Sequence, residues 1–169
     1  MKKISKALSL ALAMIMLFTS TICYGAATKS PFISNTYIHQ SKFDGYKIAN
    51  GIDISYYNGD IDFAKVKKAG VEFAIIRAGY RGYGSGGTLC NDVKYSTYIK
   101  DAKAAGIKVG VYFYSQAIDQ NEAVEEANFV LNRLAGQNLD LPVVWDIEFA
   151  GGNGTTGRLY NAKLTKSQM

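Results

Sequence analysis

Cysteine, histidine and proline are scarce in this chain of 169 residues, which holds two cysteines, one histidine and two prolines. After removal of the N-terminal segment described below, Cys90 is the one cysteine left, so an internal disulfide is excluded and a folded core must supply the stability. The lone histidine, His39, excludes metal sites built from several His or Cys ligands and argues against a Ser-His-Asp triad. We therefore expect no metal and no other cofactor.

Long apolar runs are also missing, apart from a short one near the N-terminus. Residues 1–27 begin with lysines, continue with an apolar run over residues 7–18 and end in small and polar residues. This pattern is typical of a secretory signal peptide, with cleavage after Ala27 fitting best and Ala26 as the alternative. A membrane-spanning helix needs about 20 apolar residues, and no later stretch approaches that length. We expect an exported protein with no membrane anchor after cleavage.

Excess positive charge is small once the signal peptide is removed. The formal charge of +5 includes three lysines and no acid within residues 1–27, so the mature chain carries 16 Lys and Arg against 14 Asp and Glu. A nucleic-acid-binding surface needs basic residues clustered on one face, and the sequence contains no such cluster. We expect no nucleic-acid partner.

From residue 48 onward, strand and helix patterns alternate. Apolar runs predict four strands, over residues 48–56, 73–78, 109–115 and 141–148. Helical periodicity predicts three helices, over residues 62–69, 92–105 and 120–134. Gly70, Gly106 and Gly136 follow these helices, where glycine closes a last turn in the left-handed conformation. Residues 28–47 show neither pattern and are interpreted as a linker.

The repeated β-α unit predicts a parallel sheet with right-handed crossovers. Strands this apolar are expected to be covered on both faces, which suits a doubly wound sheet or a (β/α)8 barrel. Every predicted strand ends in polar residues, and a barrel assembles its site from the ends of several strands. The pattern therefore favours an α/β fold of the TIM-like barrel type.

The chain contains only about the first four β/α units of such a barrel. Thr165 and Gln168 match a capping box, which predicts a helix that starts there and is cut short at Met169. We therefore interpret residues 48–169 as an incomplete domain.

Two acids that are two residues apart lie at the end of the last predicted strand. Asp146 and Glu148 should point to one side of that strand, with Cα atoms roughly 6.6 Å apart. Carboxylates in an apolar run are costly unless they face a cleft that solvent reaches. The pair is typical of a general acid with a carboxylate helper, and a salt-bridged strand end is the alternative.

Four motifs together resemble the glycoside hydrolase family 25 lysozymes, the Chalaropsis-type N-acetylmuramidases. They are GIDIS from Gly51, FAIIRAGY from Phe73, GVYFY from Gly110 and PVVWDIE from Pro142. They follow the family's order from about residue 48 to the end of the chain. The resemblance implies an irregular β/α barrel that hydrolyses the β-1,4 bond between N-acetylmuramic acid and N-acetylglucosamine in peptidoglycan.

The resemblance also assigns roles to three acids. It makes Glu148 the catalytic acid/base, Asp146 its assistant and Asp53 a further acid in the cleft. A neighbouring carboxylate such as Asp146 is expected to raise the pKa of Glu148. Asp146 can orient the substrate's acetamido group, act as a nucleophile or activate water, and the spacing does not separate these roles. For Asp53, a hydrogen-bonded strand-end residue is the alternative. The family supplies another acid from a later strand, beyond Met169, so we expect residues 1–169 alone to be inactive.

Aromatic and basic side chains near the strand ends are candidates for binding sugar rings. Aromatic faces offer a large apolar area with a polar tip, which suits stacking on a sugar. The predicted substrate-binding residues are Tyr80, Tyr114, Arg77 and Tyr112. Trp145 is predicted to lie in the core. Residues 79–87 lack the Gly-Lys-Ser/Thr ending of a phosphate loop and are interpreted as a flexible loop beside the cleft.

The sequence therefore predicts a secreted, cell-wall-associated muramidase, monomeric at full length, that acts on peptidoglycan glycan strands. The second hypothesis is another enzyme, a chitinase or endo-N-acetylglucosaminidase. The third hypothesis is a non-catalytic, truncated domain that binds cell-wall glycan. The new reducing ends in digested peptidoglycan distinguish the two enzymes, and binding without soluble product indicates the third hypothesis.

Overall fold

The computed structural model describes residues 28–29, 36–37 and 40–169. The predicted signal peptide, residues 1–27, and His39 lie outside these ranges. The chain divides into two compact units at Lys47 and Ile48. In the first unit, β1 (Thr28–Lys29) pairs antiparallel with β2 (Thr36–Tyr37), and a short 3-10 helix, η1, covers Ser41–Phe43.

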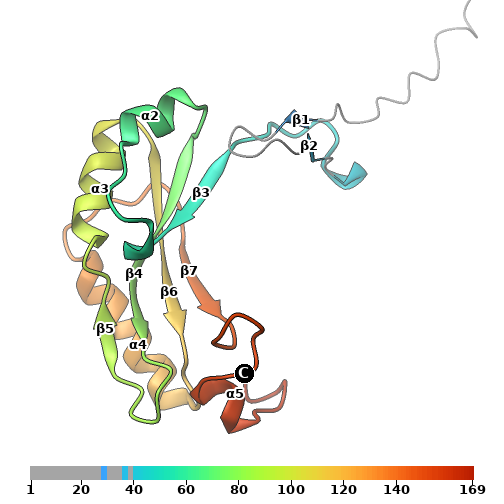
Figure 1. The fold of residues 1–169 in the computed structure, drawn as a ribbon, viewed down its shortest axis with the longest axis vertical. Helices are drawn as coiled ribbons and strands as arrows, with labels where there is room; N and C mark the ends of the chain where they lie inside the picture. Colours follow the sequence, from blue (N-terminus) through green and yellow to red (C-terminus); the bar gives the residue numbers. More distant parts are fainter. Residues whose placement is uncertain (1–27, 30–35, 38–39) are drawn as a thin grey trace, which may run out of the picture. The chain divides into compact units, whose positions relative to one another are not determined.

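The second unit is built on a mostly parallel sheet, as the repeated β-α pattern predicts. Its parallel strands are β3 (Gly51–Ile54), β4 (Phe73–Arg81), β6 (Lys108–Ser115) and β7 (Val143–Ile147), which lie side by side in chain order (Figure 1). A short strand, β5 (Leu89–Asn91), pairs antiparallel with the end of β4. All four predicted strands are confirmed, with ends that differ by a few residues.

Three helices connect these strands and lie on the same side of the sheet (Figure 1). They are α2 (Phe63–Lys68), α3 (Tyr95–Ala104) and α4 (Gln120–Leu134). The three predicted stop glycines adopt positive φ angles, 95° at Gly70, 70° at Gly106 and 75° at Gly136, so the helix ends are confirmed. A doubly wound sheet carries helices on both faces, and this arrangement differs from it.

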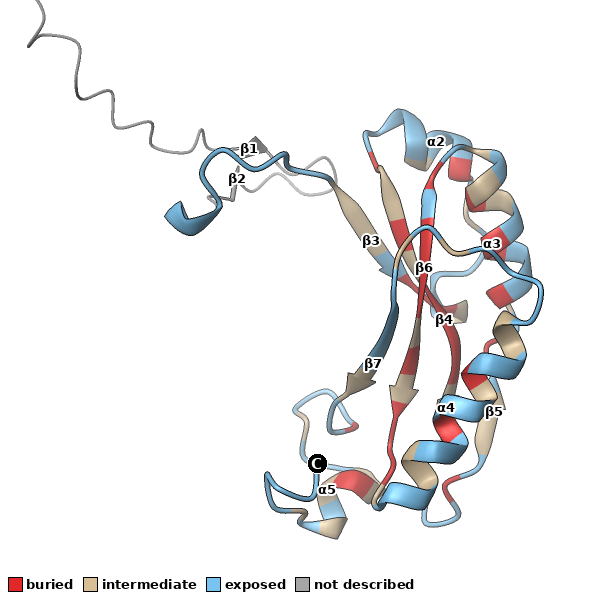
Figure 2. Cartoon of the chain, turned by 180° about the vertical axis from the view of Figure 1, so that it is seen from behind, coloured by how far each residue is buried: buried red, intermediate tan, exposed pale blue. Residues whose placement is uncertain are grey.

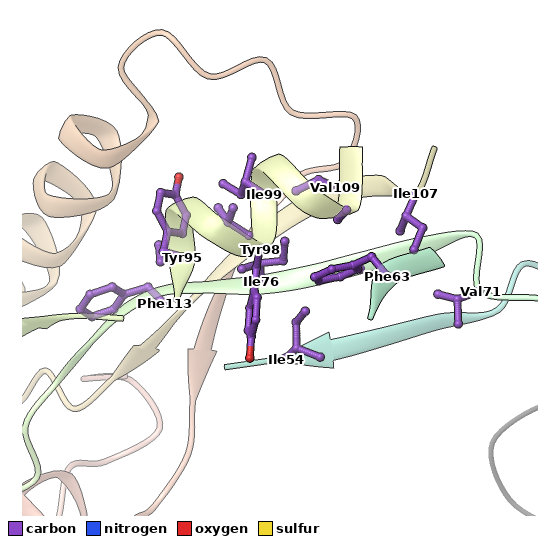
Figure 3. Close-up of a cluster of buried hydrophobic side chains, with 14 of the residues drawn as sticks. Ile54, Phe63, Val71, Ile76, Tyr95, Tyr98, Ile99, Ile107, Val109 and Phe113 are labelled. Carbon is purple, nitrogen blue, oxygen red and sulfur yellow. The ribbon is translucent and has the colours of Figure 1, made fainter. Parts of the chain in front are cut away.

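The core lies between the three helices and the sheet (Figure 3). Phe63 of α2 and Tyr98 of α3 pack edge to face with ring centroids 5.7 Å apart, and Ile76 and Val109 from the sheet are fully buried beside them. Among the described residues, no helix lies on the opposite face of the sheet, and Val144 on that face is 44% exposed (Figure 2). The expectation that both faces are covered is therefore wrong for the residues described.

Trp145 is also predicted wrongly. It faces α4, yet 46% of it is exposed. The reason is that β7 is an edge strand, so no neighbouring strand or helix covers its outer side. Edge positions depend on what lies next to them in space, which an apolar run does not specify.

Six short elements among the described residues were not predicted. They are β1, β2 and η1 in the segment interpreted as a linker, a second 3-10 helix, η2 (Tyr56–Asn58), and the elements β5 and α5. The hairpin strand β5 and the helix α5 (Arg158–Ala162) lie in segments rich in glycine and polar residues. In residues 165–169, the backbone N–H groups of Gln168 and Met169 both donate to the Thr165 carbonyl oxygen, and the Thr165 N–H donates to Gln168 Oε1 at 2.9 Å. The single turn predicted before Met169 and half of the capping box are therefore present. Among the described residues, no helix has the length and apolar character that crossing a bilayer needs.

Candidate active site

The predicted site residues gather on the open face of the sheet. Arg77, Tyr112 and Val144 are register partners across β4, β6 and β7, and Tyr80, Tyr114 and Asp146 form a second row. Partners in a register stand on the same side of a sheet. A bulge between Arg77 and Gly79 shifts the register of β4, and this shift brings Tyr80 into line with Tyr114.

The three predicted acids lie close enough to influence one another. Asp146 is half-buried on β7, whereas Glu148, just past the end of β7, and Asp53 of β3 are exposed. Burial raises the pKa of Asp146 above its usual value, and the negative charges of Glu148 and Asp53 raise it further. The carboxylate pair is thus formed at the strand end.

The alternative interpretation of this pair is a salt-bridged strand end. In the part of the chain that the structure describes, neither Asp146 nor Glu148 forms an ion pair with a lysine or arginine. There, lysines and arginines form ion pairs with other acids, in the loops near α2 and α3 and on α4. Carboxylates that face an open surface without a cation are available to a ligand.

Two tyrosines of β6 flank the acids. Burial raises the pKa of Tyr112 to about 12, with the charges of Asp53 and Asp146 adding to the effect and that of Arg77 opposing it. Burial also raises the pKa of Tyr114, and the charges of Glu148 and Asp146 contribute. Both phenols therefore stay protonated at neutral pH, and each remains a hydrogen-bond donor beside the carboxylates.

Arg77 is held in place by a buried aspartate that the sequence did not single out. Its Nε donates to Asp92 Oδ2 at 2.9 Å, and Asp92 also accepts from the backbone N–H groups of Tyr56 and Lys94. The guanidinium carbon lies 5.0 Å from the ring centroid of Tyr80 and 5.1 Å from that of Tyr56. Its Nη2 is buried and has no hydrogen-bond partner among the described residues. Asp92 begins a predicted helix, a position where an Asp is ordinarily interpreted as a cap.

A second buried acid, Glu126 of α4, binds the sheet from the helix side. It accepts hydrogen bonds from Arg81 Nε at 2.8 Å, Ser115 Oγ at 2.6 Å and Trp145 Nε1 at 3.0 Å. Its position four residues before Val130, on the apolar side of α4, is the sequence signal that could have identified it. It fastens β4, β6 and β7 to α4 behind the open face.

Within residues 28–29, 36–37 and 40–169, no three His, Cys, Asp or Glu side chains are grouped as metal ligands. The site therefore consists of three carboxylates, the three tyrosines Tyr80, Tyr112 and Tyr114, and Arg77 on the open face of a parallel sheet. Acids at the C-terminal ends of parallel strands are the arrangement with which many barrel enzymes hydrolyse glycosidic bonds.

Comparison with known proteins identifies the family to which the chain belongs. The sequence profile of "Glycosyl hydrolases family 25" matches residues 52–169, and the chain belongs to this family. It is 35% identical over 102 residues to "Autolytic lysozyme" of Clostridium acetobutylicum, covering 60% of this chain and 29% of that protein. It is 33% identical over 101 residues to "Lysozyme M1" of Streptomyces globisporus, covering 58% of this chain and 32% of that protein. The chain thus spans about a third of the length of these relatives.

A solved structure shares the fold. The modular autolysin LytC from Streptococcus pneumoniae, in complex with a synthetic peptidoglycan ligand, superimposes with a TM-score of 0.52 at 26% identity. The match covers 66% of this chain and 28% of LytC. The resemblance drawn from four short motifs is confirmed at the level of the family.

Proposed function

We propose that the full-length protein is a muramidase that hydrolyses the β-1,4 bond between N-acetylmuramic acid and N-acetylglucosamine in peptidoglycan. The observation that carries the proposal is the grouping of Asp53, Asp146 and Glu148 on one open sheet face of a family 25 chain. The lysozyme names of two relatives and the peptidoglycan ligand of LytC support it.

In this proposal Glu148 is the acid/base. It is exposed at the end of β7, where it can reach the oxygen of a glycosidic bond lying across the open face. Asp146 assists by orienting the acetamido group of the substrate, by acting as a nucleophile or by activating water. Burial raises the pKa of Asp146, and the negative charges of Glu148 and Asp53 raise it further. A positively charged transition state beside Asp146 would stabilise its ionised form. Asp53 shapes the far side of the site from β3.

Tyr80, Tyr112, Tyr114 and Arg77 are the proposed sugar-binding residues. The two phenols of β6 offer donors to sugar hydroxyl or carbonyl oxygens, and the ring of Tyr80 stands in the same row as Tyr114. Arg77 lies over the ring of Tyr80 and supplies positive charge to a site with three acids. This mixture of aromatic rings and polar groups suits an oxygen-rich ligand such as a glycan.

We further propose that the sheet forms the first part of an irregular (β/α)8-type barrel in the full-length protein. The single-sided helices and the chain-order strands support this. A groove of about 500 Å³ between α4 and β7 also supports it, because it is lined by exposed apolar residues such as Leu131, Val143 and Trp145. A following strand and helix would cover it. The predicted signal peptide would carry the protein out of the cell to the wall, where we expect it to act as a monomer.

The test is product analysis on purified peptidoglycan with the full-length protein. Borohydride reduction of the new ends should yield reduced muramic acid. Reduced glucosamine would favour the endo-N-acetylglucosaminidase reading, and binding without soluble fragments would favour the glycan-binding reading.

The matched variants are Glu148→Gln and Glu125→Gln. Glu125 lies on α4, where its carboxylate pairs with Arg81 on the helix side of the sheet. Removing a general acid ordinarily lowers a rate by about 100- to 10,000-fold, so Glu148→Gln should lose that much and Glu125→Gln should keep its rate. Substantial lysis by Glu148→Gln would overturn the assignment of the acid.

A further inference from the structure

Gln116, the residue after β6, is fully buried although it is polar and stands at a strand end. Its Nε2 donates to the carbonyl oxygen of Glu148 at 2.6 Å and to that of Ser115 at 3.0 Å, and its Oε1 accepts from the Leu159 N–H at 3.4 Å. A buried amide whose donors and acceptor all have partners is held in one orientation, because any rotation leaves a polar group unsatisfied.

The hydrogen bond from Gln116 to Glu148 lies just past the point where the pairing between β6 and β7 ends. The β6–β7 register ends at the pair Ser115 and Ile147, so Glu148 is the first residue beyond the ladder. The side chain of Gln116 continues the pairing by one residue, with a side-chain N–H in place of a backbone N–H. It thereby fixes the backbone of Glu148 relative to β6 and to Tyr114 on that strand.

The surroundings of Gln116 leave it little room to move. Arg158 Nη1 donates to the Gln116 carbonyl at 3.0 Å, and Arg158 is itself paired with Glu122 of α4, with Nη2 2.7 Å from Oε1. A Cβ on Gly157 would lie 2.7 Å from Gln116 Oε1, and Gly157 has a φ of 92°, so this position favours glycine for both reasons. Three segments, the end of β6, α4 and the start of α5, therefore meet around this amide.

We propose that Gln116 is a positioning residue for Glu148, which it holds by its backbone at the reach needed for proton transfer. The inference rests on the acid/base role proposed for Glu148. Displacing a catalytic group by about 1 Å can lower the rate about 100-fold. Glu148 lies beyond the last backbone pair of β6 and β7, so the hydrogen bond from Gln116 takes the place of that pairing.

The test is steady-state kinetics of the full-length protein on a soluble peptidoglycan fragment. Gln116→Met keeps the volume and neutrality of the side chain but removes the Nε2 donor to Glu148, together with the Oε1 acceptor of the Leu159 N–H. We expect kcat to fall about 10- to 100-fold with KM changed less than about twofold, because Gln116 acts through Glu148 and not through the bound sugar.

Leu159→Ala is the matched control. Leu159 is buried at the same junction and offers Gln116 only its backbone N–H, which alanine retains. This variant should lower the melting temperature and leave kcat per folded molecule unchanged. Should Gln116→Met fail to fold, Gln116→Asn, which is one methylene shorter, is measured in its place with the same expectation.

A parental kcat in the Gln116 variant, or an equal loss of kcat in Leu159→Ala, would overturn the positioning role. The proposed function is tested separately by Glu148→Gln. If that variant is inactive while the Gln116 variant is fully active, only the positioning role fails. If Glu148→Gln remains active, the proposed function fails first.

Discussion

The two faces of the parallel sheet differ sharply although alternate residues of the same strands form them. On the helix side, Ile76, Val111 and Phe113 are at most 1% exposed. On the open side, Tyr112 and Tyr114 alternate with them along β6 and remain partly exposed beside three acids. Because side chains alternate along a strand, one face can supply stability while the other carries the chemistry. Substitutions one residue apart should therefore have separable effects.

The largest expected effect on stability comes from the neighbours Phe113 and Tyr114. Phe113→Ala removes a buried ring that packs 5.4 Å from Phe129 between ring centroids, and should cost about 3–5 kcal/mol of unfolding free energy. Tyr114→Phe removes only a hydroxyl from the open face and should change that free energy by less than about 1 kcal/mol. Denaturant unfolding of both variants of the full-length protein measures this difference.

Hydrolysis rates should rank these two variants in the opposite order. Tyr114→Phe loses a donor beside Asp146 and Glu148, so we expect a clear fall in its rate, while folded Phe113→Ala keeps the site. Equal destabilisation by the two substitutions would contradict the separation of the faces.

The next effect concerns Glu126, the buried acid behind the site. Glu126→Gln brings an amide N–H₂ among four donors, the side chains of Arg81, Ser115 and Trp145 and the backbone N–H of Gln116. It should lower the unfolding free energy by about 3 kcal/mol, since a buried charged partner is lost. Glu125→Gln on the same helix is the control, and thermal unfolding is the measurement. A Glu126→Gln protein with parental stability would show that this network contributes little.

The smallest expected effect is a gain in stability at Asp146. Burial and two neighbouring carboxylates raise the pKa of Asp146 in the folded protein. Its ionisation therefore destabilises the fold as the pH rises from its usual range through the raised value. Asp146→Asn should raise the melting temperature at pH 7. The difference in melting temperature between the variant and the parent should vanish near pH 3, where the side chain at position 146 is neutral in both proteins. A less stable Asp146→Asn protein at pH 7 would contradict this.

Much of the fold could be predicted because it depends on local pattern. The helix over residues 120–134 has the predicted bounds, since its amphipathic spacing and the Asp119 cap are both encoded nearby. The strand β5 was missed because three residues carry no periodicity, and it exists through pairing with β4. The exposure of Trp145 was missed because it depends on what covers the edge of the sheet.

The candidate site divides in the same way. Asp146 and Glu148 share a face by parity, and Asp53, Arg77, Tyr112 and Tyr114 follow from the rule that strand ends gather at one edge. Tyr80 lies in the same row as Tyr114 only because the bulge after Arg77 shifts the register of β4, and no sequence pattern predicts that bulge. Asp92, Gln116 and Glu126 could not be assigned, because their importance lies in partners distant along the chain, such as Arg81 at a separation of 45 residues from Glu126.

The most direct test of the central claim compares Glu148→Gln with Glu126→Gln in the full-length protein. Lysis rate and unfolding free energy are measured for both. The open-face variant should lose about 100-fold or more in rate with its stability unchanged, as expected for a general acid. The helix-side variant should lose stability, and its rate per folded molecule should fall far less than that of Glu148→Gln. Parental lysis by Glu148→Gln, or a loss of stability in place of activity, would contradict the assignment of the open face as the active site.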